Sequence, residues 1–102
     1  MNLGFIYVTA PNIKVAKKIS RQLLKIQLIA CSNIFPKINS LFTWNGKLEE
    51  TQEVAMFLKS KKSNFNQIKN EIIKLHPYKC PCVALINIEK INLEYGNWLK
   101  GI

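Results

Sequence analysis

The chain has 102 residues and is 48% apolar, which is enough for one small domain, residues 1–102, with a modest core. Its 15 lysines and arginines against 6 acidic residues give a net charge of +9, so nucleic acid has to be considered as a partner. No apolar run reaches the roughly 20 residues of a transmembrane helix, and we expect no membrane span. Three cysteines without a secretory leader predict free thiols in a reducing compartment, the cytoplasm.

The first elements in chain order are a strand and a surface helix. Residues 3–10 form an apolar run that ends at Pro11-Asn12 and predicts a buried strand. Asn12 is placed to cap a helix. Apolar side chains recur along that helix at helical spacing and predict its buried face: Ala16, Ile19, Leu23 and Ile26.

A long hairpin follows, centred on Asn45-Gly46, a pair of residues typical of a two-residue turn. Its arms are residues 33–44 and 47–58, and about 3.3 Å per residue gives each arm about 40 Å. A domain of this size has a radius of gyration of about 13 Å, so the tip should extend past its own core.

Pairing from a two-residue turn places apolar side chains on both faces of the hairpin. The expected pairs are Trp44 with Lys47, Phe42 with Glu49, Ile38 with Glu53 and Ile34 with Phe57. Leu41, Leu48, Phe35 and Met56 then share the other face. Because an isolated two-stranded ribbon is marginal in water, we interpret the hairpin as an oligomerisation arm. The alternative is a shorter hairpin with a bulge near Pro36.

The second half adds a helix, a strand and a helical tail. A basic connector is expected at 59–62, and Ser63 or Asn64 should cap a helix that ends at His76-Pro77. The apolar positions of that helix are Phe65, Ile68, Ile72 and Leu75. The continuous apolar run 83–88 predicts an interior strand, and 93–99 predicts a short helix.

This order predicts an α+β, ferredoxin-like βαββαβ fold with an antiparallel sheet, a long central hairpin and a short C-terminal helix. The scaffold carries many unrelated functions, so side chains have to decide between them. His76 is the sole histidine, aspartate is absent, and the sole arginine, Arg21, lies within a predicted helix. A base, its orienting group and an anion clamp cannot be assembled from these residues, and we predict no enzymatic activity.

Nucleic-acid binding is also not expected. The strand that an RNA-recognition module would use for aromatic stacking carries Glu49, Glu50 and Glu53 here, which would repel phosphate. We therefore interpret the lysines as a solvated surface. An RNA-binding ferredoxin-like domain remains the third hypothesis for function.

Soft metal ligands gather after the second predicted helix. His76, Cys80 and Cys82 offer an imidazole and two thiols within seven residues, a set that suits Cu(I) or Zn(II). Cys80 and Cys82 would point to one side of an extended segment. The alternative is that both cysteines are small apolar residues at the start of a strand, and the intervening Lys79 argues against a metal.

Together these segments resemble the CutA-type divalent-cation tolerance family, which is similar in fold to the PII signalling proteins. The resemblance covers residues 7–99. It is carried by Thr9-Ala10-Pro11, Leu28 to Ile34, Ser40 to Glu49, Glu53, Lys59-Ser60, His76-Pro77-Tyr78, Pro81, Tyr95 and Trp98.

The resemblance implies a non-catalytic homotrimer held together by the hairpin, with copper or another divalent metal ion as its cofactor. On the family pattern the cleft between subunits would hold Cys31, Glu53, Lys59 and Tyr78. The trimer interface would hold Ile38, Phe42, Trp44 and Leu48. A purely structural or partner-binding trimer, with no direct metal role, is the alternative function.

The chain also departs from the family pattern. Lys79 and Cys82 stand where the family has glutamate, and Val8 and Leu75 stand where some bacterial members have a cysteine and a second histidine. Of that copper-ligand set only His76 remains. For Cys31, a packed thiol at the start of a strand is favoured over a ligand.

Overall fold

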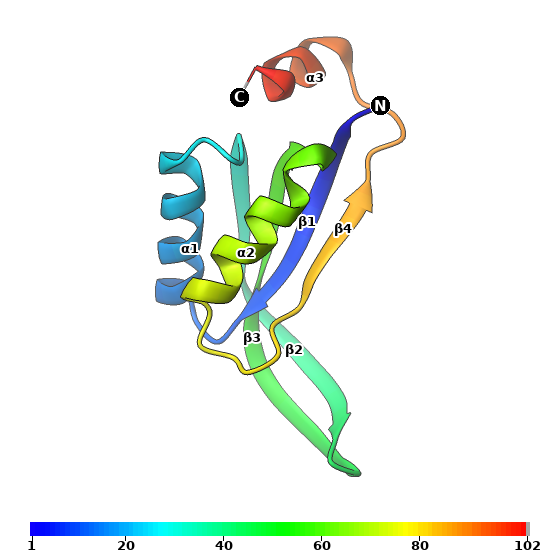
Figure 1. The fold of residues 1–102 in the computed structure, drawn as a ribbon. Coiled ribbons are helices and arrows are strands. Elements are labelled where there is room, and N and C mark those ends of the chain that lie inside the picture. The colour runs from blue at the N-terminus through cyan, green and yellow to red at the C-terminus, as the bar shows by residue number, and fades with distance from the viewer. Residues whose placement is uncertain (102) are drawn as a thin grey trace.

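The computed structural model describes residues 1–101 and shows an antiparallel sheet with helices on one face (Figure 1). The elements in chain order are β1 (Leu3–Ala10), α1 (Ile13–Lys25), β2 (Cys31–Trp44), β3 (Lys47–Lys61), a short 3₁₀ turn (Lys62–Asn64), α2 (Phe65–Leu75), β4 (Val83–Asn87) and α3 (Leu93–Lys100). The strand order is β2-β3-β1-β4, and each neighbouring pair is antiparallel. The predicted α+β, ferredoxin-like fold is confirmed.

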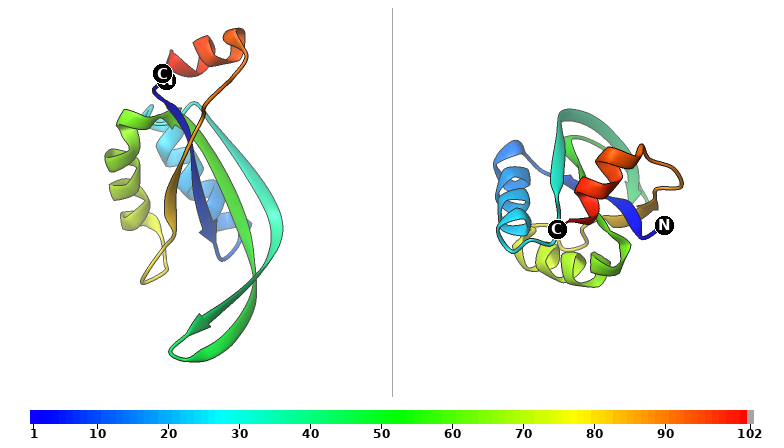
Figure 2. Two further views of the ribbon diagram at one scale, coloured as in Figure 1. Left: turned by 90° about the vertical axis from the view of Figure 1, so that its right-hand side faces the viewer. Right: turned by 90° about the horizontal axis from the view of Figure 1, so that it is seen from above.

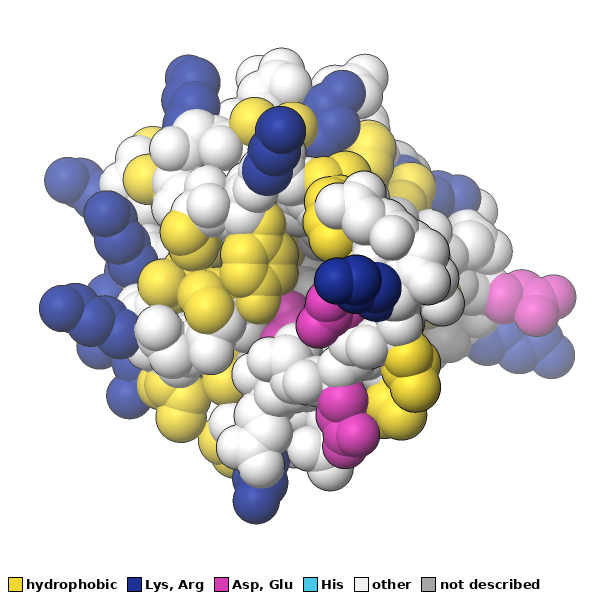
Figure 3. All heavy atoms as spheres, turned by 90° about the horizontal axis from the view of Figure 1, so that it is seen from below, with side chains coloured by type: hydrophobic (Ala, Val, Ile, Leu, Met, Phe, Trp, Pro, Cys, Tyr) yellow, Lys and Arg dark blue, Asp and Glu magenta, His cyan; other side chains and the backbone are white. Residues whose placement is uncertain are grey.

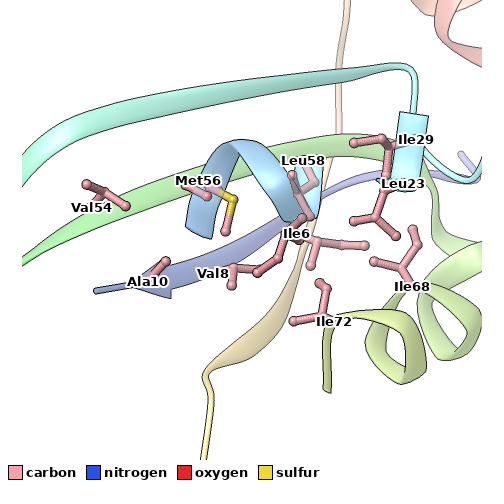
Figure 4. Packing of buried hydrophobic residues seen from close by; sticks show 12 residues of the cluster. Ile6, Val8, Ala10, Leu23, Ile29, Val54, Met56, Leu58, Ile68 and Ile72 are labelled. Atoms are coloured by element: carbon pink, nitrogen blue, oxygen red, sulfur yellow. The ribbon is translucent and has the colours of Figure 1, made fainter. Parts of the chain in front are cut away.

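The core lies between the sheet and the two helices α1 and α2 (Figure 4). Asn12 caps α1 as predicted, because its side-chain oxygen accepts the backbone N–H of Val15 at 2.9 Å. Ile19 and Leu23 of α1 and Ile68 and Ile72 of α2 are fully buried. Burial of such a side chain contributes about 1.5 to 3 kcal/mol, so these two apolar stripes fix both helices on the sheet.

The hairpin extends beyond the rest of the molecule, as the sequence predicts (Figures 1 and 2). Asn45 and Gly46 have φ angles of 52° and 76°, the left-handed values that a two-residue type I′ turn requires. The molecule measures 45 × 26 × 23 Å, and α3 lies at the end opposite the hairpin tip.

A bulge in the hairpin makes part of its predicted register wrong. Trp44, Phe42 and Ile38 face Lys47, Glu49 and Glu53 as predicted, but the register shifts between Phe35 and Ile38. Beyond the shift, Ile34 pairs with Met56, so the predicted pairing of Ile34 with Phe57 is wrong. One extra residue moves every later side chain to the other face, and Pro36, which lacks an N–H, lies within the shift.

The bulge changes which aromatic residues meet. Phe35 packs edge-on against Phe57 at 5.5 Å, on the face of the sheet away from Met56 and the core. The predicted shared face of Phe35 and Met56 is therefore wrong. Phe5 and Tyr7 of β1 also contact Phe57, at 6.1 and 5.4 Å between ring centroids.

Three smaller predictions are corrected. Lys59 belongs to β3, which continues to Lys61, so the expected connector is shorter. Strand β4 lies at the edge of the sheet and not in its interior, and its Ile86 is 44% exposed. Ile26 follows the last residue of α1 as its C-cap and is exposed, because the helix has ended there.

Candidate functional site

A hollow of about 540 Å³ lies between the hairpin and the loop that follows α2; we call it the hairpin hollow. Its lining residues are Thr9, Phe42, Trp44, Thr51, Glu53, Tyr78, Lys79, Cys80 and Cys82. The view from below shows hydrophobic side chains gathered beside acidic ones, with many of the Lys and Arg side chains around the edge (Figure 3). The volume is within the range of about 300 to 1,000 Å³ that small-molecule sites occupy.

Glu53 is the buried charge of the hairpin hollow. It lies on β3 opposite Ile38 and is only 9% exposed. The Tyr78 hydroxyl donates a hydrogen bond of 2.6 Å to Oε2 of Glu53. Burial first, and then the hydrogen bond and the charge of Glu53, raise the pKa of Tyr78 above its ordinary value. Tyr78 therefore stays protonated and keeps donating at any physiological pH.

His76 holds the loop that carries Tyr78. Its Nε2 lies 2.7 Å from the carbonyl oxygen of Thr9, and its Nδ1 accepts the backbone N–H of Tyr78 at 3.1 Å. A carbonyl only accepts and an amide only donates, so the neutral ring with its proton on Nε2 satisfies both partners. The ring also packs on Tyr78 at 4.6 Å between centroids. Both ring nitrogens are thus engaged in positioning the loop.

Cys80 and Cys82 line the hairpin hollow beside Glu53, and both are free and largely exposed. They lie in the loop, because β4 begins at Val83. The partial burial of the Cys82 thiol against the hollow, then the charge of Glu53 and then that of Cys80, raise its pKa. At neutral pH this thiol is therefore protonated, and a metal or an electrophile must displace its proton.

The structure does not bring His76 together with the two cysteines as a ligand set. Among residues 1–101, no group of three or more His, Cys, Asp or Glu side chains is arranged to hold a metal ion. The ring nitrogens of His76 face Thr9 and Tyr78 instead. Cys80 and Cys82 line the hairpin hollow together, whereas His76 is not among the lining residues.

The predicted cleft residues fall into two separate places. Glu53 and Tyr78 meet in the hairpin hollow, whereas Cys31 pairs with Lys59 at the other end of β3. Lys59 follows Glu53 by six positions on the same strand, which is about 20 Å at about 3.3 Å per residue. Lys59 instead donates to the Tyr95 hydroxyl at 3.2 Å and lies 5.1 Å from the centre of that ring.

The four predicted interface residues occupy both faces of the hairpin. Alternation along the paired strands places Ile38, Phe42 and Trp44 on the face that carries Glu53, and Leu48 on the opposite face. Trp44 is 53% exposed and Leu48 is 76% exposed. Each face of this ribbon therefore leaves apolar area in water within a single chain.

Sequence reasoning missed two hydroxyl side chains of the site, Thr9 and Thr51. Thr51 lies two residues before Glu53, so the period of two along a strand could have identified it. Thr9 pairs with Ala55 of β3 near the end of β1, and only the tertiary arrangement brings it to the loop after α2.

The fold and this site define a class: a small α+β protein whose overhanging hairpin and one loop enclose a carboxylate, a phenol and two thiols. Residues 4–101 match the family model described as CutA1 divalent ion tolerance protein. The chain therefore belongs to the CutA1 divalent ion tolerance protein family.

Individual relatives agree with this assignment. The Archaeoglobus fulgidus divalent-cation tolerance protein CutA is 41% identical over 96 residues, which cover 94% of this chain and 93% of that protein. Human protein CutA is 36% identical over 94% of this chain and 54% of its own length. The solved structure of the Thermus thermophilus protein has a TM-score of 0.93 at 33% identity, covering 96% of this chain and 95% of that one.

Proposed function

We propose that this protein is a non-catalytic homotrimer that takes part in tolerance of, or response to, copper and other divalent metal ions. Membership of a family of divalent ion tolerance proteins supports the coarse role. The observation that carries the direct metal role is the placement of Cys80 and Cys82 on the same hollow as the buried Glu53.

The donors of the hairpin hollow favour one kind of metal. Structural zinc needs about four nitrogen or sulfur ligands, and one chain offers two thiols here. Thiolates select soft ions, so the pair fits copper in its Cu(I) state better than zinc. When bound, the metal would be held by Cys80 and Cys82, while His76 keeps the loop in place.

The trimer is proposed from the unpartnered hairpin. Apolar side chains are exposed on both of its faces, and the outer edges of β2 and β4 have no strand beside them within residues 1–101. Cyclic closure would cover such surfaces without leaving an edge open to further assembly.

Three free thiols support the predicted cytoplasmic location, although the Archaeoglobus fulgidus protein of known structure is described as periplasmic.

The site itself supports the non-catalytic part of the proposal. Both nitrogens of His76 are occupied by backbone groups, so the ring is not free to act as a base. Glu53 accepts a hydrogen bond from a phenol and lies beside Cys82, whose pKa is raised by partial burial and by the charge of Glu53. We propose that this site binds and does not turn over substrate.

None of the helices within residues 1–101 has both the length and the apolar character needed to cross a bilayer.

A competition titration with Cu(I), under reductant and without oxygen, tests the metal proposal. We expect the Cys80→Ser/Cys82→Ser variant to bind Cu(I) at least about tenfold more weakly than the parent, a loss of about 1.4 kcal/mol. Cys31→Ser is the matched control, since Cys31 lies at the other end of β3. Equal Cu(I) affinity in the double variant, or a loss only in Cys31→Ser, would overturn the direct role of the hairpin hollow.

A further inference from the structure

We propose that a groove between α1 and the end of α2 binds an acidic peptide segment of a partner protein, with the cations of α1 as its anchors. We call it the basic groove; it has a volume of about 430 Å³. Its lining residues are Lys14, Lys18, Arg21, Gln22, Lys25 and Leu75. The inference goes beyond the proposed metal role, because none of these residues lines the hairpin hollow.

Helical spacing places four cations of the basic groove in one row. These residues, which we call the cation row, are Lys14, Lys18, Arg21 and Lys25. They are all exposed and follow one another at intervals of four, three and four residues, so their side chains share one face of α1. At about 1.5 Å per residue the row is about 17 Å long. Figure 3 shows several basic side chains along its left edge, the side that α1 forms in Figure 1.

No acidic side chain within residues 1–101 is found to pair with the cation row. Helix α1 contains no aspartate or glutamate, and the ion pair found in this part of the chain joins Lys74 to Glu71 on α2. Like charges three or four residues apart on a helix repel each other. A partner that brings carboxylates to the row relieves this repulsion, so charge complementarity favours an anionic ligand over a neutral one.

An extended peptide matches the cation row in length and spacing. Side chains alternate along an extended chain, so carboxylates at every second residue lie about 6.6 Å apart on one side. Successive cations of the row lie about 4.5 to 6 Å apart along the helix axis, and flexible lysine stems absorb the difference. The other side of the peptide then faces Leu75, a half-buried residue that can contact one apolar side chain.

The composition of the groove favours a peptide over other polyanions. Its lining contains no aromatic ring on which a nucleobase could stack. A helix that lies on a lipid surface inserts its apolar face between the lipids. The apolar face of α1, which includes Ile19 and Leu23, is fully buried against the sheet and is not available for this.

The basic groove stays open in the proposed trimer. The contacts proposed between subunits use the hairpin and the outer edges of β2 and β4, and no lining residue of the groove belongs to those segments. Helices α1 and α2 lie on one face of the sheet, and the groove lies between them, since Leu75 of α2 completes its lining (Figure 2). Each subunit of a trimer would therefore present one such groove to the solvent.

The test is an NMR titration of the intact protein, at physiological salt, with the peptide acetyl-Glu-Ser-Glu-Leu-Glu-Ser-Glu-amide. We expect it to bind at least about tenfold more tightly than the same peptide with glutamine in place of each glutamate. Lys18→Gln/Arg21→Gln, which removes two charges of the cation row, should weaken binding of the acidic peptide at least about fivefold.

Lys90→Gln/Lys100→Gln is the matched control. It removes the same charge from two exposed lysines that do not line the groove, so the affinity should change less than about twofold. Equal binding of the two peptides, or a loss in Lys18→Gln/Arg21→Gln no larger than in this control, would overturn the proposal.

Two other polyanions are tested against the peptide. One is a five-nucleotide oligouridylate, whose four linking phosphates match the charge of the peptide, and the other is phosphatidylserine vesicles. Tighter binding of either one, with a loss in Lys18→Gln/Arg21→Gln, would assign the groove to that polyanion and overturn the peptide proposal. The Cys80→Ser/Cys82→Ser variant should keep its affinity for the peptide while it loses Cu(I), and a parallel loss of both would contradict the separate roles of groove and hollow.

Discussion

The hydroxyl of Tyr78 donates to Oε2 of Glu53 at 2.6 Å, and this bond joins the loop after α2 to the strand at the base of the hairpin. Two residues earlier, at the start of the same loop, His76 contacts the carbonyl oxygen of Thr9 on β1. A helix end, a central strand and the hairpin are thus linked at the wall of one hollow.

Tyr78→Phe should destabilise the protein. The substitution keeps the ring but leaves the buried Glu53 carboxylate without its donor, which costs roughly 1 to 3 kcal/mol. Urea unfolding at pH 7 measures the change. Tyr95→Phe is the control, because the Tyr95 hydroxyl meets Lys59 at the far end of β3. Equal losses of unfolding free energy in the two variants would show that the bond to Glu53 stabilises the protein no more than the bond between Tyr95 and Lys59.

His76→Ala should act on stability and on loop order. It leaves the carbonyl of Thr9 and the N–H of Tyr78 without partners, and each such buried group costs about 1 to 3 kcal/mol. Denaturant unfolding and amide hydrogen exchange at Tyr78 measure both effects. Lys74→Ala, which removes a surface ion pair with Glu71, should cost less than about 1 kcal/mol. A His76→Ala protein as stable as the Lys74→Ala control would contradict the positioning role.

The pH dependence of Cys82 alkylation reports the charge of Glu53. Only the thiolate reacts, and the raised pKa of Cys82 displaces its rate profile with iodoacetamide to higher pH than that of an ordinary cysteine. Glu53→Gln removes one cause of the rise, so the profile should shift to lower pH and the rate at pH 8 should increase. Cys80 and Cys82 lie on one peptide, so fragmentation of that peptide by tandem mass spectrometry assigns the label to Cys82, and Cys31 lies on a separate peptide. An unchanged profile would mean that Glu53 carries no charge beside this thiol.

Trp44→Glu should dissociate or destabilise the proposed trimer, because it places a charge in an apolar contact between subunits. Asn66→Glu, an equal change of charge on exposed α2, is the control and should leave the assembly intact. Sedimentation equilibrium at micromolar concentration distinguishes monomer from trimer. A monomeric parent protein, or a Trp44→Glu variant as trimeric as the parent, would refute the oligomerisation arm.

Local patterns predicted most of the fold. The Asn45-Gly46 turn, the Asn12 cap and the two apolar helix stripes all act through neighbours in sequence, so the sequence reveals them. The bulge near Pro36 was foreseen only as part of a shorter hairpin. Its position decides the partners of Ile34 and Phe35. The shift lies opposite Val54, where the pairing of β3 with β1 ends, and that place is a feature of the whole sheet.

The site was predictable only in part. From the sequence, His76 could be a polar group at a helix end or a metal ligand. The two roles differ in the partners of the ring nitrogens, and one of those partners, the carbonyl oxygen of Thr9, comes from a distant part of the chain. Glu53 and Tyr78 were placed together through the family pattern, and the structure adds the bond between them. Strand geometry alone predicts that Glu53 and Lys59 lie far apart on one strand. They were grouped in one cleft only because of the family pattern.

The most direct test of the proposed metal role is an anomalous difference map at the copper edge, from crystals grown with Cu(I) under reductant. We expect a peak between the sulfur atoms of Cys80 and Cys82 at the hairpin hollow, with no peak at Cys31. A copper peak at Cys31 alone, or no peak in crystals whose copper content equals the protein content, would contradict it.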